Sequence, residues 1–532
     1  MGKLRIFFIA VPLSAILIAG AIYFVNPANR TRGEVVIVIP QNPFIRNFDT
    51  NYYKQWLEEQ TGLSIRFNTI YEANTADYLR SMFASGYVQS DAFFDFLSDE
   101  DSADRLSILQ EFGEKGYIIP LDGFIEQSIY LNAIIEEYPE YDWHTLKSPD
   151  GKIYFMPALD PSMPESHFQV LWLNLSWLKN LRLSIPQTTE ELREVLYAFK
   201  TRDPNGNNRN DEIPLAGSRD APAGQSYQFI INAFVYNDPA NSHLFIEDGV
   251  VRFAPMTGKW REAMIFLHEL YADGLLSPFE FTTEHYGLAA LANDPQNILG
   301  GFTSKSVTDV IFPTNPEIIT NFIHIAPIAG PDGARNATAF TPFPRPAGVI
   351  TSNCENPEAV FRLFDLMLSE EAFLIGRFGE KGVDWIPAHI TDTDLYGGIA
   401  KIRVINQLRN IVQNKHFNET GPFFAYPRYA DSVTFSAFEA NQEYVNARAY
   451  RVYQQYKPKE YIRGIYFDGG AQEFQTLRQA VDEYTEESIE AFVTGGKDPF
   501  DDAVWESHEN TYRTIGIDTL IHAVQTMYDF SN

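Results

Sequence analysis

The chain has 532 residues, 45% hydrophobic and 14% aromatic, which predicts a globular protein with room for two or more lobes. Its formal net charge of −29 at pH 7 argues against nucleic-acid binding, which depends on clustered Lys and Arg. The same charge disfavours a strongly anionic ligand unless the pocket is locally basic. A single cysteine, Cys354, excludes an internal disulfide framework.

The N-terminal segment contains an apolar run long enough to span a bilayer. Lys3 and Arg5 precede residues 6–25, which carry no charge, so we expect the N-terminus inside and the rest of the chain outside the cytoplasmic membrane. Ala19-Gly20-Ala21 resembles a cleavage site, and a cleaved signal peptide, giving a secreted or periplasmic protein, is the alternative. Because the apolar run continues past that site, we expect residues 1–32 to form a retained anchor and tether.

From residue 34 onward, strand-like and helix-like patterns alternate. Strands are expected near residues 35–39, 63–70 and 92–97, with helices near 52–59 and 76–84 between them. This alternation predicts an α/β protein with an open parallel sheet. Ligands of such sheets lie beyond the carboxyl ends of the strands, so Gln41 and Asn42 are candidate ligand contacts. An ordinary exposed turn at Asn42-Pro43 is the alternative.

A further helix, after residue 188, is marked by its N-terminal signals. Thr188 and Glu191 have the spacing of a capping box. The apolar residues that recur at helical spacing behind them are Leu192, Val195, Leu196 and Phe199.

The loop after this helix has the spacing of a cation site. Oxygen-bearing side chains stand two residues apart at Asp203, Asn205 and Asn207, and Asp211 and Glu212 close the run. An EF-hand uses positions 1, 3 and 5 in this way, but closes with a Glu at position 12 that is missing here. A calcium site and a plain polar turn are both consistent with this spacing.

Six segments, in their order, carry a resemblance to a known family. They are DGKIYFMP (150–157), WLKNLRLSIPQTTEELREVLYAFKTRDPNGNNRNDEIPLAG (177–217), LYADGLL (270–276), ITSNCENPEAVFRLFDLMLSEEAF (350–373), FGEKGVDW (378–385) and FVTGGKDPFDDAVW (492–505). Together they resemble extracellular solute-binding proteins of family 1, in the branch that serves bacterial ABC importers of oligosaccharides.

The resemblance implies a fold and a function. The fold would be two α/β lobes joined by crossing segments, with the ligand in the cleft between them. We expect a first lobe of residues 33–157 plus about 323–365, and a second of 158–322 plus 366–532. The protein would be a monomer that captures an oligosaccharide and delivers it to an ABC permease. Most relatives carry a lipobox cysteine, which this chain lacks.

The resemblance also bears on the loop at 203–212. Alginate-binding members of the group hold a structural calcium ion in the same loop. Carried over by position, the calcium ligands would be Asp203, Asn205, Asn207, the backbone oxygen of Arg209, Asp211 and Glu212.

Residues of the sugar cleft are predicted on chemical grounds. Sugar rings stack on aromatic faces, and their hydroxyls take hydrogen bonds from fixed polar groups. The candidates are Tyr154, Trp172, Arg377, Trp385, Phe423 and Tyr426. Each aromatic residue has a core position as the alternative, and Arg377 could instead pair with Glu380. For Trp177 we expect a core position.

An enzyme is the main alternative function. A glycosidase needs two carboxylates at set distances, and a lyase needs a Tyr, His or Lys base. The sequence contains no HExxH, GxSxG or GxxxxGK[ST] motif. We therefore expect no catalysis. A surface sensor or adhesion protein with the same fold is a further alternative.

Overall fold

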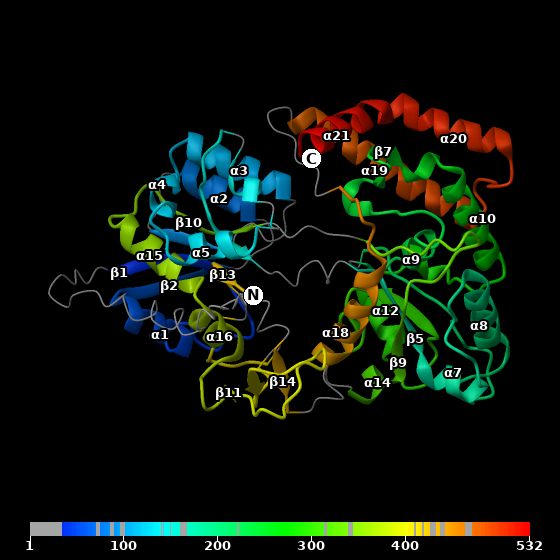
Figure 1. Ribbon diagram of the computed structural model, residues 1–532, viewed down its shortest axis with the longest axis horizontal. Coiled ribbons are helices and arrows are strands. Elements are labelled where there is room, and N and C mark those ends of the chain that lie inside the picture. The colour runs from blue at the N-terminus through cyan, green and yellow to red at the C-terminus, as the bar shows by residue number, and fades with distance from the viewer. Residues whose placement is uncertain are drawn as a thin grey trace, which may run out of the picture.

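The computed structural model describes residues 34–70, 75–85, 90–95, 102–139, 141, 143–148, 150–159, 168–220, 223–312, 316–338, 344–408, 411–417, 420–425, 432–436, 442–462 and 471–531. These residues form two lobes that lie side by side (Figure 1). The predicted anchor at residues 6–25 lies outside the described residues. Within them, every helix is too short or too polar to cross a membrane.

The first lobe is built on a six-stranded sheet of order β13-β4-β10-β3-β1-β2. Its strands are β1 (Glu34–Pro40), β2 (Ser64–Ile70), β3 (Ala92–Phe94), β4 (Met156–Leu159), β10 (Arg345–Ile350) and β13 (Phe423–Phe424). As predicted, β1 is parallel to β2 and to β3. The later strand β10 departs from this parallel pattern, because it is antiparallel to both β3 and β4.

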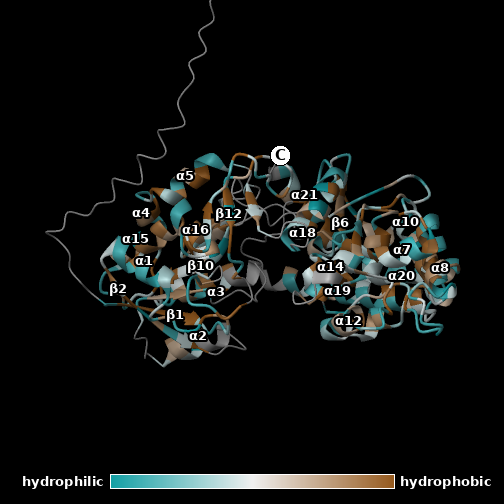
Figure 2. Ribbon diagram, turned by 90° about the horizontal axis from the view of Figure 1, so that it is seen from below, coloured by the Kyte–Doolittle hydropathy of each residue, from teal (hydrophilic) through white to brown (hydrophobic). Residues whose placement is uncertain are grey.

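Helices cover both faces of this sheet (Figure 2). They are α1 (Tyr52–Thr61), α2 (Thr75–Ala84), α3 (Ser102–Glu114), α4 (Asp122–Ile125), α5 (Tyr130–Glu137), η3 (Trp143–Leu146), α15 (Pro357–Met367) and α16 (Glu370–Phe378). Local signals set their ends. The Asn51 side chain accepts from the N–H groups of Tyr53 and Lys54 at the start of α1, and Gly62 ends that helix at φ 70°. A small sheet of β11 (Trp385–Pro387), β12 (Ile402–Val404) and β14 (Val433–Phe435) adjoins this lobe.

The second lobe is built around a three-stranded antiparallel sheet of order β8-β5-β9. Its strands are β5 (Val170–Asn174), β8 (Gly301–Ser304) and β9 (Phe322–Ile325), with a separate hairpin of β6 (Leu244–Glu247) and β7 (Val250–Phe253). The surrounding helices are α7 (Leu175–Leu181), α8 (Thr189–Thr201), α9 (Ser226–Ile231), η4 (Pro239–Asn241), η5 (Ala254–Met256), α10 (Gly258–Ala272), α11 (Phe279–Thr282), α12 (His285–Ala292), α13 (Val307–Val310) and α14 (Pro316–Asn321).

Helix α8 follows its sequence signals closely. Thr188 caps it by accepting from the N–H of Glu191, and Leu192, Val195, Leu196 and Phe199 are buried. The Glu191 carboxylate accepts from the N–H of Gln187, one residue before the position that a capping box uses.

The C-terminal helices pack on the second lobe. They are α18 (Gln442–Tyr453), η7 (Gln454–Tyr456), α19 (Ala471–Thr494), α20 (Asp502–Ile515) and α21 (Ile517–Ser531). The later half of α18 and the end of α19 join the main core of this lobe, whereas α21 closes a small apolar cluster over β6 and β7.

The two cores show where the chain passes from lobe to lobe. It passes between Leu159 and Phe168, between Thr338 and Pro344, and between Ser436 and Gln442. Residues 366–435 therefore pack with the first lobe and residues 322–337 with the second, which differs from the predicted boundaries. The reason is that α16, β12 and β13 bury their apolar residues against the first core.

Candidate ligand-binding edge of the first lobe

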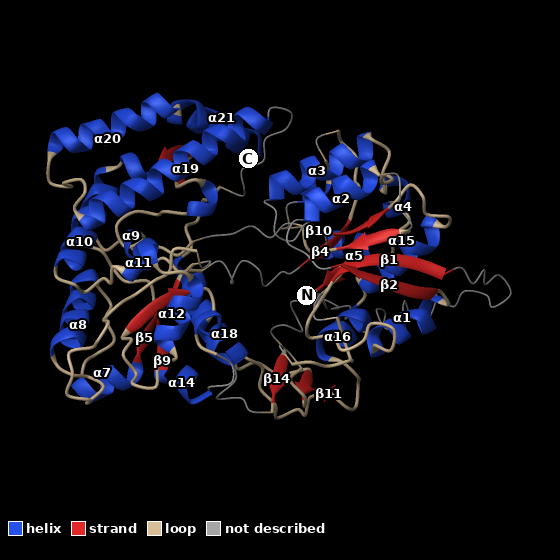
Figure 3. Ribbon diagram, turned by 180° about the vertical axis from the view of Figure 1, so that it is seen from behind, coloured by secondary structure: helices blue, strands red, loops and turns tan. Residues whose placement is uncertain are grey.

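One edge of the six-stranded sheet faces the second lobe. The strands β1, β2, β3, β4 and β13 run in one direction, so their carboxyl ends share an edge with the start of the antiparallel β10. Figure 3 shows β1 and β2 running toward the second lobe. Two of the three passages between the lobes adjoin this edge, at Leu159 and at Pro344. It is the edge at which open α/β sheets bind ligands.

A charged pair lies at this edge. Asp95 directly follows β3, and its N–H donates to Ala347 O at 2.9 Å. Its Oδ1 lies 3.2 Å from Nη1 of Arg345, the first residue of β10. Its Oδ2 accepts from the N–H of Gly421, just before β13. The carboxylate thus holds together three segments that are distant in sequence.

The guanidinium of Arg345 also lies near an aromatic ring. Its carbon is 5.9 Å from the ring centroid of Phe423, which is only partly buried. The Arg345 side chain is 27% exposed, against 11% for Asp95. Within the described residues, Arg345 Nε and Nη2 have no hydrogen-bond partner. A partly exposed aromatic ring beside planar N–H donors offers the two kinds of contact that a sugar ring uses.

Gln41 and Asn42, the predicted contacts after β1, also lie at this edge. Gln41 is exposed, and its backbone N–H donates to Ile70 O at 2.9 Å. Asn42 Oδ1 accepts from the N–H of Phe44, so this side chain shapes the turn that was the alternative. The Gln41 side chain is the freer of the two.

Three predicted aromatic contacts are buried in the cores. Tyr154 is 1% exposed and donates to Asp150 Oδ2 at 2.8 Å; burial, and then this carboxylate, raises the pKa of Tyr154 to about 12. Trp172 lies fully buried on β5, as Trp177 does on α7, the latter as predicted. Trp385 is 5% exposed. These rings fill the interior, so we do not retain Tyr154, Trp172 or Trp385 as ligand contacts.

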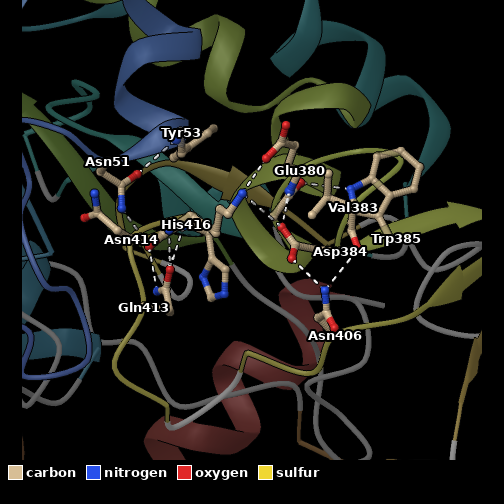
Figure 4. Close-up of polar contacts among 12 residues, drawn as sticks. Asn51, Tyr53, Glu380, Val383, Asp384, Trp385, Asn406, Gln413, Asn414 and His416 are labelled. Carbon is tan, nitrogen blue, oxygen red and sulfur yellow. Dashed lines mark hydrogen bonds and ion pairs between the residues drawn. The ribbon is translucent and has the colours of Figure 1, made fainter.

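Trp385 belongs to a polar loop that Figure 4 shows in close-up. Its Nε1 donates to Gly379 O at 2.9 Å. Asp384, 3% exposed, accepts from the N–H of Glu380 and from Asn406 Nδ2. Lys415 forms ion pairs with both Glu380 and Asp384. This network fixes the loop. In it Glu380, the alternative partner suggested for Arg377, forms its ion pair with Lys415.

Arg377 and Tyr426 are the two remaining candidates. Arg377 is half-buried near the end of α16. Desolvation, and then the charge of Arg377, lowers the pKa of buried His416 to about 4. Tyr426 lies outside the described residues.

The loop at 203–212 turns sharply on itself. Asp203 and Gly206 have φ of 45° and 72°. Asp203 Oδ1 and Asn205 Oδ1 both accept from the N–H of Asn207, at 3.0 and 3.1 Å. Asn207 Nδ2 donates to both carboxylate oxygens of Asp211. Four of the predicted metal-ligating side chains thus lie within one compact turn, together with the backbone of Arg209, whose N–H donates to Asn207 Oδ1.

Glu212 is the least satisfied residue of this loop. Its Oε1 is buried and has no hydrogen-bond partner in the described part of the chain. Desolvation raises the pKa of Glu212, and the charges of Asp211 and Asp203 raise it further. No group of three or more His, Cys, Asp or Glu side chains in the described residues has an arrangement that could hold a metal ion. A cation in this loop would therefore need the Asn oxygens as well.

Comparison with known proteins gives the relatives of this chain. No protein-family model matches it. The fructooligosaccharide ABC transporter substrate-binding protein FusA of Streptococcus pneumoniae is 25% identical over 497 residues, 89% of this chain and 86% of FusA. The structure of FusA in complex with kestose matches with a TM-score of 0.71 at 22% identity, over 94% of this chain and 99% of that one.

The chain is a homologue of ABC-transporter substrate-binding proteins. The predicted two-lobe α/β fold is confirmed, and these homologues are binding proteins rather than enzymes.

Two further relatives bear on the other predictions. The lipoprotein LipO of Bacillus subtilis is 23% identical over 281 residues, 52% of this chain and 51% of LipO. The alginate-binding protein AlgQ2, solved without calcium ion, matches with a TM-score of 0.61 at 20% identity, over 94% of this chain and 99% of AlgQ2. An EF-hand mutant of FusA has also been solved, in complex with fructo-nystose.

Proposed function

We propose that this homologue captures an oligosaccharide outside the cytoplasmic membrane and delivers it to an ABC permease. The observation that carries the proposal is the partly exposed Phe423 ring beside the free N–H donors of Arg345, at the sheet edge that faces the second lobe. Gln41 completes this edge. The complex of FusA with kestose and the name of the alginate-binding relative support an oligosaccharide as the ligand.

Partner and location belong to the same proposal. The chain works as a monomer, with permease subunits as its partners in the membrane. Residues 1–32 hold it at the outer surface, and the lipoprotein relative supports a membrane-attached mode of action. The lobes close on the ligand by a hinge motion, which shifts the population toward the closed state.

Isothermal titration calorimetry against neutral oligosaccharides, oligouronates and peptides tests the proposal. We expect an oligosaccharide to bind, and Phe423→Ala to weaken that binding about fivefold, since stacking on an aromatic ring contributes on the order of 1 kcal/mol. Tyr197→Ala is the matched control, because Tyr197 is 57% exposed on α8. Binding of peptides alone, or turnover of a bound glycan, would contradict the proposal.

We also propose that the loop at 203–212 holds a structural calcium ion. The residues that would hold it are Asp203, Asn205, Asn207, Arg209 through its backbone oxygen, Asp211 and Glu212. A hard cation suits this set of oxygen ligands and would satisfy the buried Glu212 Oε1. It would also offset the repulsion that raises the pKa of Glu212. Calcium, which accepts six to eight oxygen ligands, fits better than magnesium, which usually keeps several waters.

Thermal unfolding with and without chelator tests the calcium site. Calcium at a hundredfold excess over its dissociation constant stabilises the folded chain by about 2.7 kcal/mol. We therefore expect chelator to lower Tm, and calcium to restore Tm better than magnesium does. Asp203→Ala removes this response, whereas Asn210→Ala, in the same loop but outside the proposed ligand set, keeps it. An unchanged Tm in chelator, with no calcium by elemental analysis, returns the loop to a plain polar turn.

A further inference from the structure

The charge balance at the first-lobe edge bears on which oligosaccharides can bind there. An arginine in a sugar site can bind a sugar carboxylate through a bidentate pair, or it can donate to neutral hydroxyls. Which of the two it does depends on whether its charge is already neutralised. Here the guanidinium of Arg345 is paired with Asp95 at 3.2 Å.

Contacts with β10 and with the segment before β13 fix Asp95 in this role. Its backbone N–H is bonded to β10, its Oδ1 to Arg345 and its Oδ2 to the N–H of Gly421. The side chain is 11% exposed, so water screens its charge poorly. A second carboxylate brought to Arg345 would therefore meet the Asp95 charge at close range and through a medium of low dielectric.

We propose that Asp95 makes the Arg345 subsite select neutral sugar rings and reject uronates. This inference rests on the proposed function and assigns its substrate class. Arg345 donates through Nε and Nη2 to hydroxyls of a ring that stacks on Phe423, and Asp95 supplies the negative charge that a bound carboxylate would otherwise supply. Asp95 is thus a specificity-determining residue.

The variant Asp95→Asn isolates this charge. Asp95 has φ 52°, in the left-handed region that Asn tolerates better than most residues, so the substitution suits the backbone. An amide oxygen can still accept from the N–H of Gly421. The change therefore removes the charge while keeping size and most of the local geometry.

The experiment is calorimetry with two trisaccharide probes, kestose and an alginate trimer, on the full chain and its variants. Kestose binds the wild-type chain at least tenfold more tightly than the alginate trimer. Asp95→Asn shifts the ratio of the two affinities at least tenfold toward the uronate. Arg345→Ala weakens kestose binding about tenfold to a hundredfold, the range for a lost hydrogen bond to a charged group. Arg66→Ala is the matched control: Arg66 pairs with Glu34 at 3.4 Å on the same sheet, at the opposite ends of β1 and β2, so this variant behaves as the wild type.

Two results would overturn the inference while leaving the proposed function intact. In one, the wild-type chain binds the alginate trimer as tightly as kestose. In the other, Asp95→Asn leaves the ratio unchanged. If the wild-type chain binds neither probe nor any other oligosaccharide, the proposed function fails together with the inference. Circular dichroism of each variant shows that the fold is retained.

Discussion

A buried carboxylate in each lobe shows how differently the two lobes use the same kind of group. Asp365, on α15 of the first lobe, is 1% exposed and accepts from Ser128 Oγ and from the N–H groups of Ile129, Tyr130 and Leu131. Glu280, on α11 of the second lobe, is fully buried. Its Oε1 accepts from the N–H groups of Ser226 and Tyr227.

The difference lies in the second oxygen. Glu280 Oε2 has no hydrogen-bond partner among the described residues, and burial raises the pKa of Glu280 to about 8. Burial also raises the pKa of Asp365, and hydrogen bonds oppose the shift at both residues, but at Asp365 they reach both carboxylate oxygens. Donors at both oxygens thus make Asp365 an anchor for the start of α5, whereas Glu280 is hydrogen-bonded through Oε1 alone within the described residues. The number of donors, not burial alone, decides the role.

The largest expected effect comes from removing the better-satisfied group. Asp365→Ala leaves the buried Ser128 hydroxyl without its acceptor and removes the carboxylate that accepts from the N–H groups of Ile129, Tyr130 and Leu131. We expect a loss of about 3–5 kcal/mol in the free energy of unfolding of the first lobe. Urea denaturation followed by circular dichroism measures it. Asp365→Asn keeps one acceptor oxygen, so its free energy of unfolding falls less. A fall below about 1 kcal/mol in the alanine variant would show that Asp365 is not an anchor.

The second prediction concerns pH and the second lobe. Because the folded-state pKa of Glu280 lies near 8, above its ordinary 4.5, the stability it contributes is fully present below about pH 4.5 and is lost as pH rises through 8. The free energy of unfolding falls by about 1.36 kcal/mol per pH unit in this range. We therefore expect the free energy of unfolding of the second lobe to fall by about 2–4 kcal/mol between pH 5 and 8.

Hydrogen exchange measured peptide by peptide at several pH values gives the stability of each lobe separately. Glu280→Gln abolishes the fall in second-lobe stability with rising pH, because the amide does not ionise. Glu284→Gln, an exposed neighbour, is the matched control and keeps it. An identical pH profile in wild type and Glu280→Gln would contradict the raised pKa.

The third prediction concerns a single hydroxyl in the second lobe. Tyr453, at the end of α18, is 1% exposed; its hydroxyl donates to Ile325 O at 2.7 Å and accepts from Leu171 N at 3.0 Å. It thereby joins β5 and β9 to the helix that follows the last passage between the lobes. Tyr453→Phe leaves the Leu171 N–H without its acceptor and lowers second-lobe stability by about 1–3 kcal/mol. Equal destabilisation of both lobes, seen by hydrogen exchange, would show that the contact does not act locally.

Local signals in the sequence predicted local structure well. Thr188 caps α8, the apolar run at 35–39 is a buried strand, and residues 203–212 form a tight turn. Each depends on neighbours within a few residues, which a single sequence contains. The two-lobe fold was predicted from the resemblance to solute-binding proteins.

The sequence failed where distant segments decide the outcome. Arg345 begins a strand whose reversed direction depends on pairing with β3 and β4, far away in the chain. The strand predicted near residues 92–97 includes Asp95, but β3 ends at Phe94. Their meeting at one sheet edge therefore could not be predicted. Likewise nothing local distinguishes Trp385, held in the interior by Gly379 O, from a ring that faces a ligand.

The most direct test of the account is a crystal structure of the chain with a bound neutral trisaccharide. We predict a sugar ring stacked on Phe423, with hydroxyls about 3 Å from Arg345 Nε and Nη2 and the Asp95–Arg345 pair intact. A sugar bound elsewhere, with Arg345 and Phe423 free of contact, would contradict it.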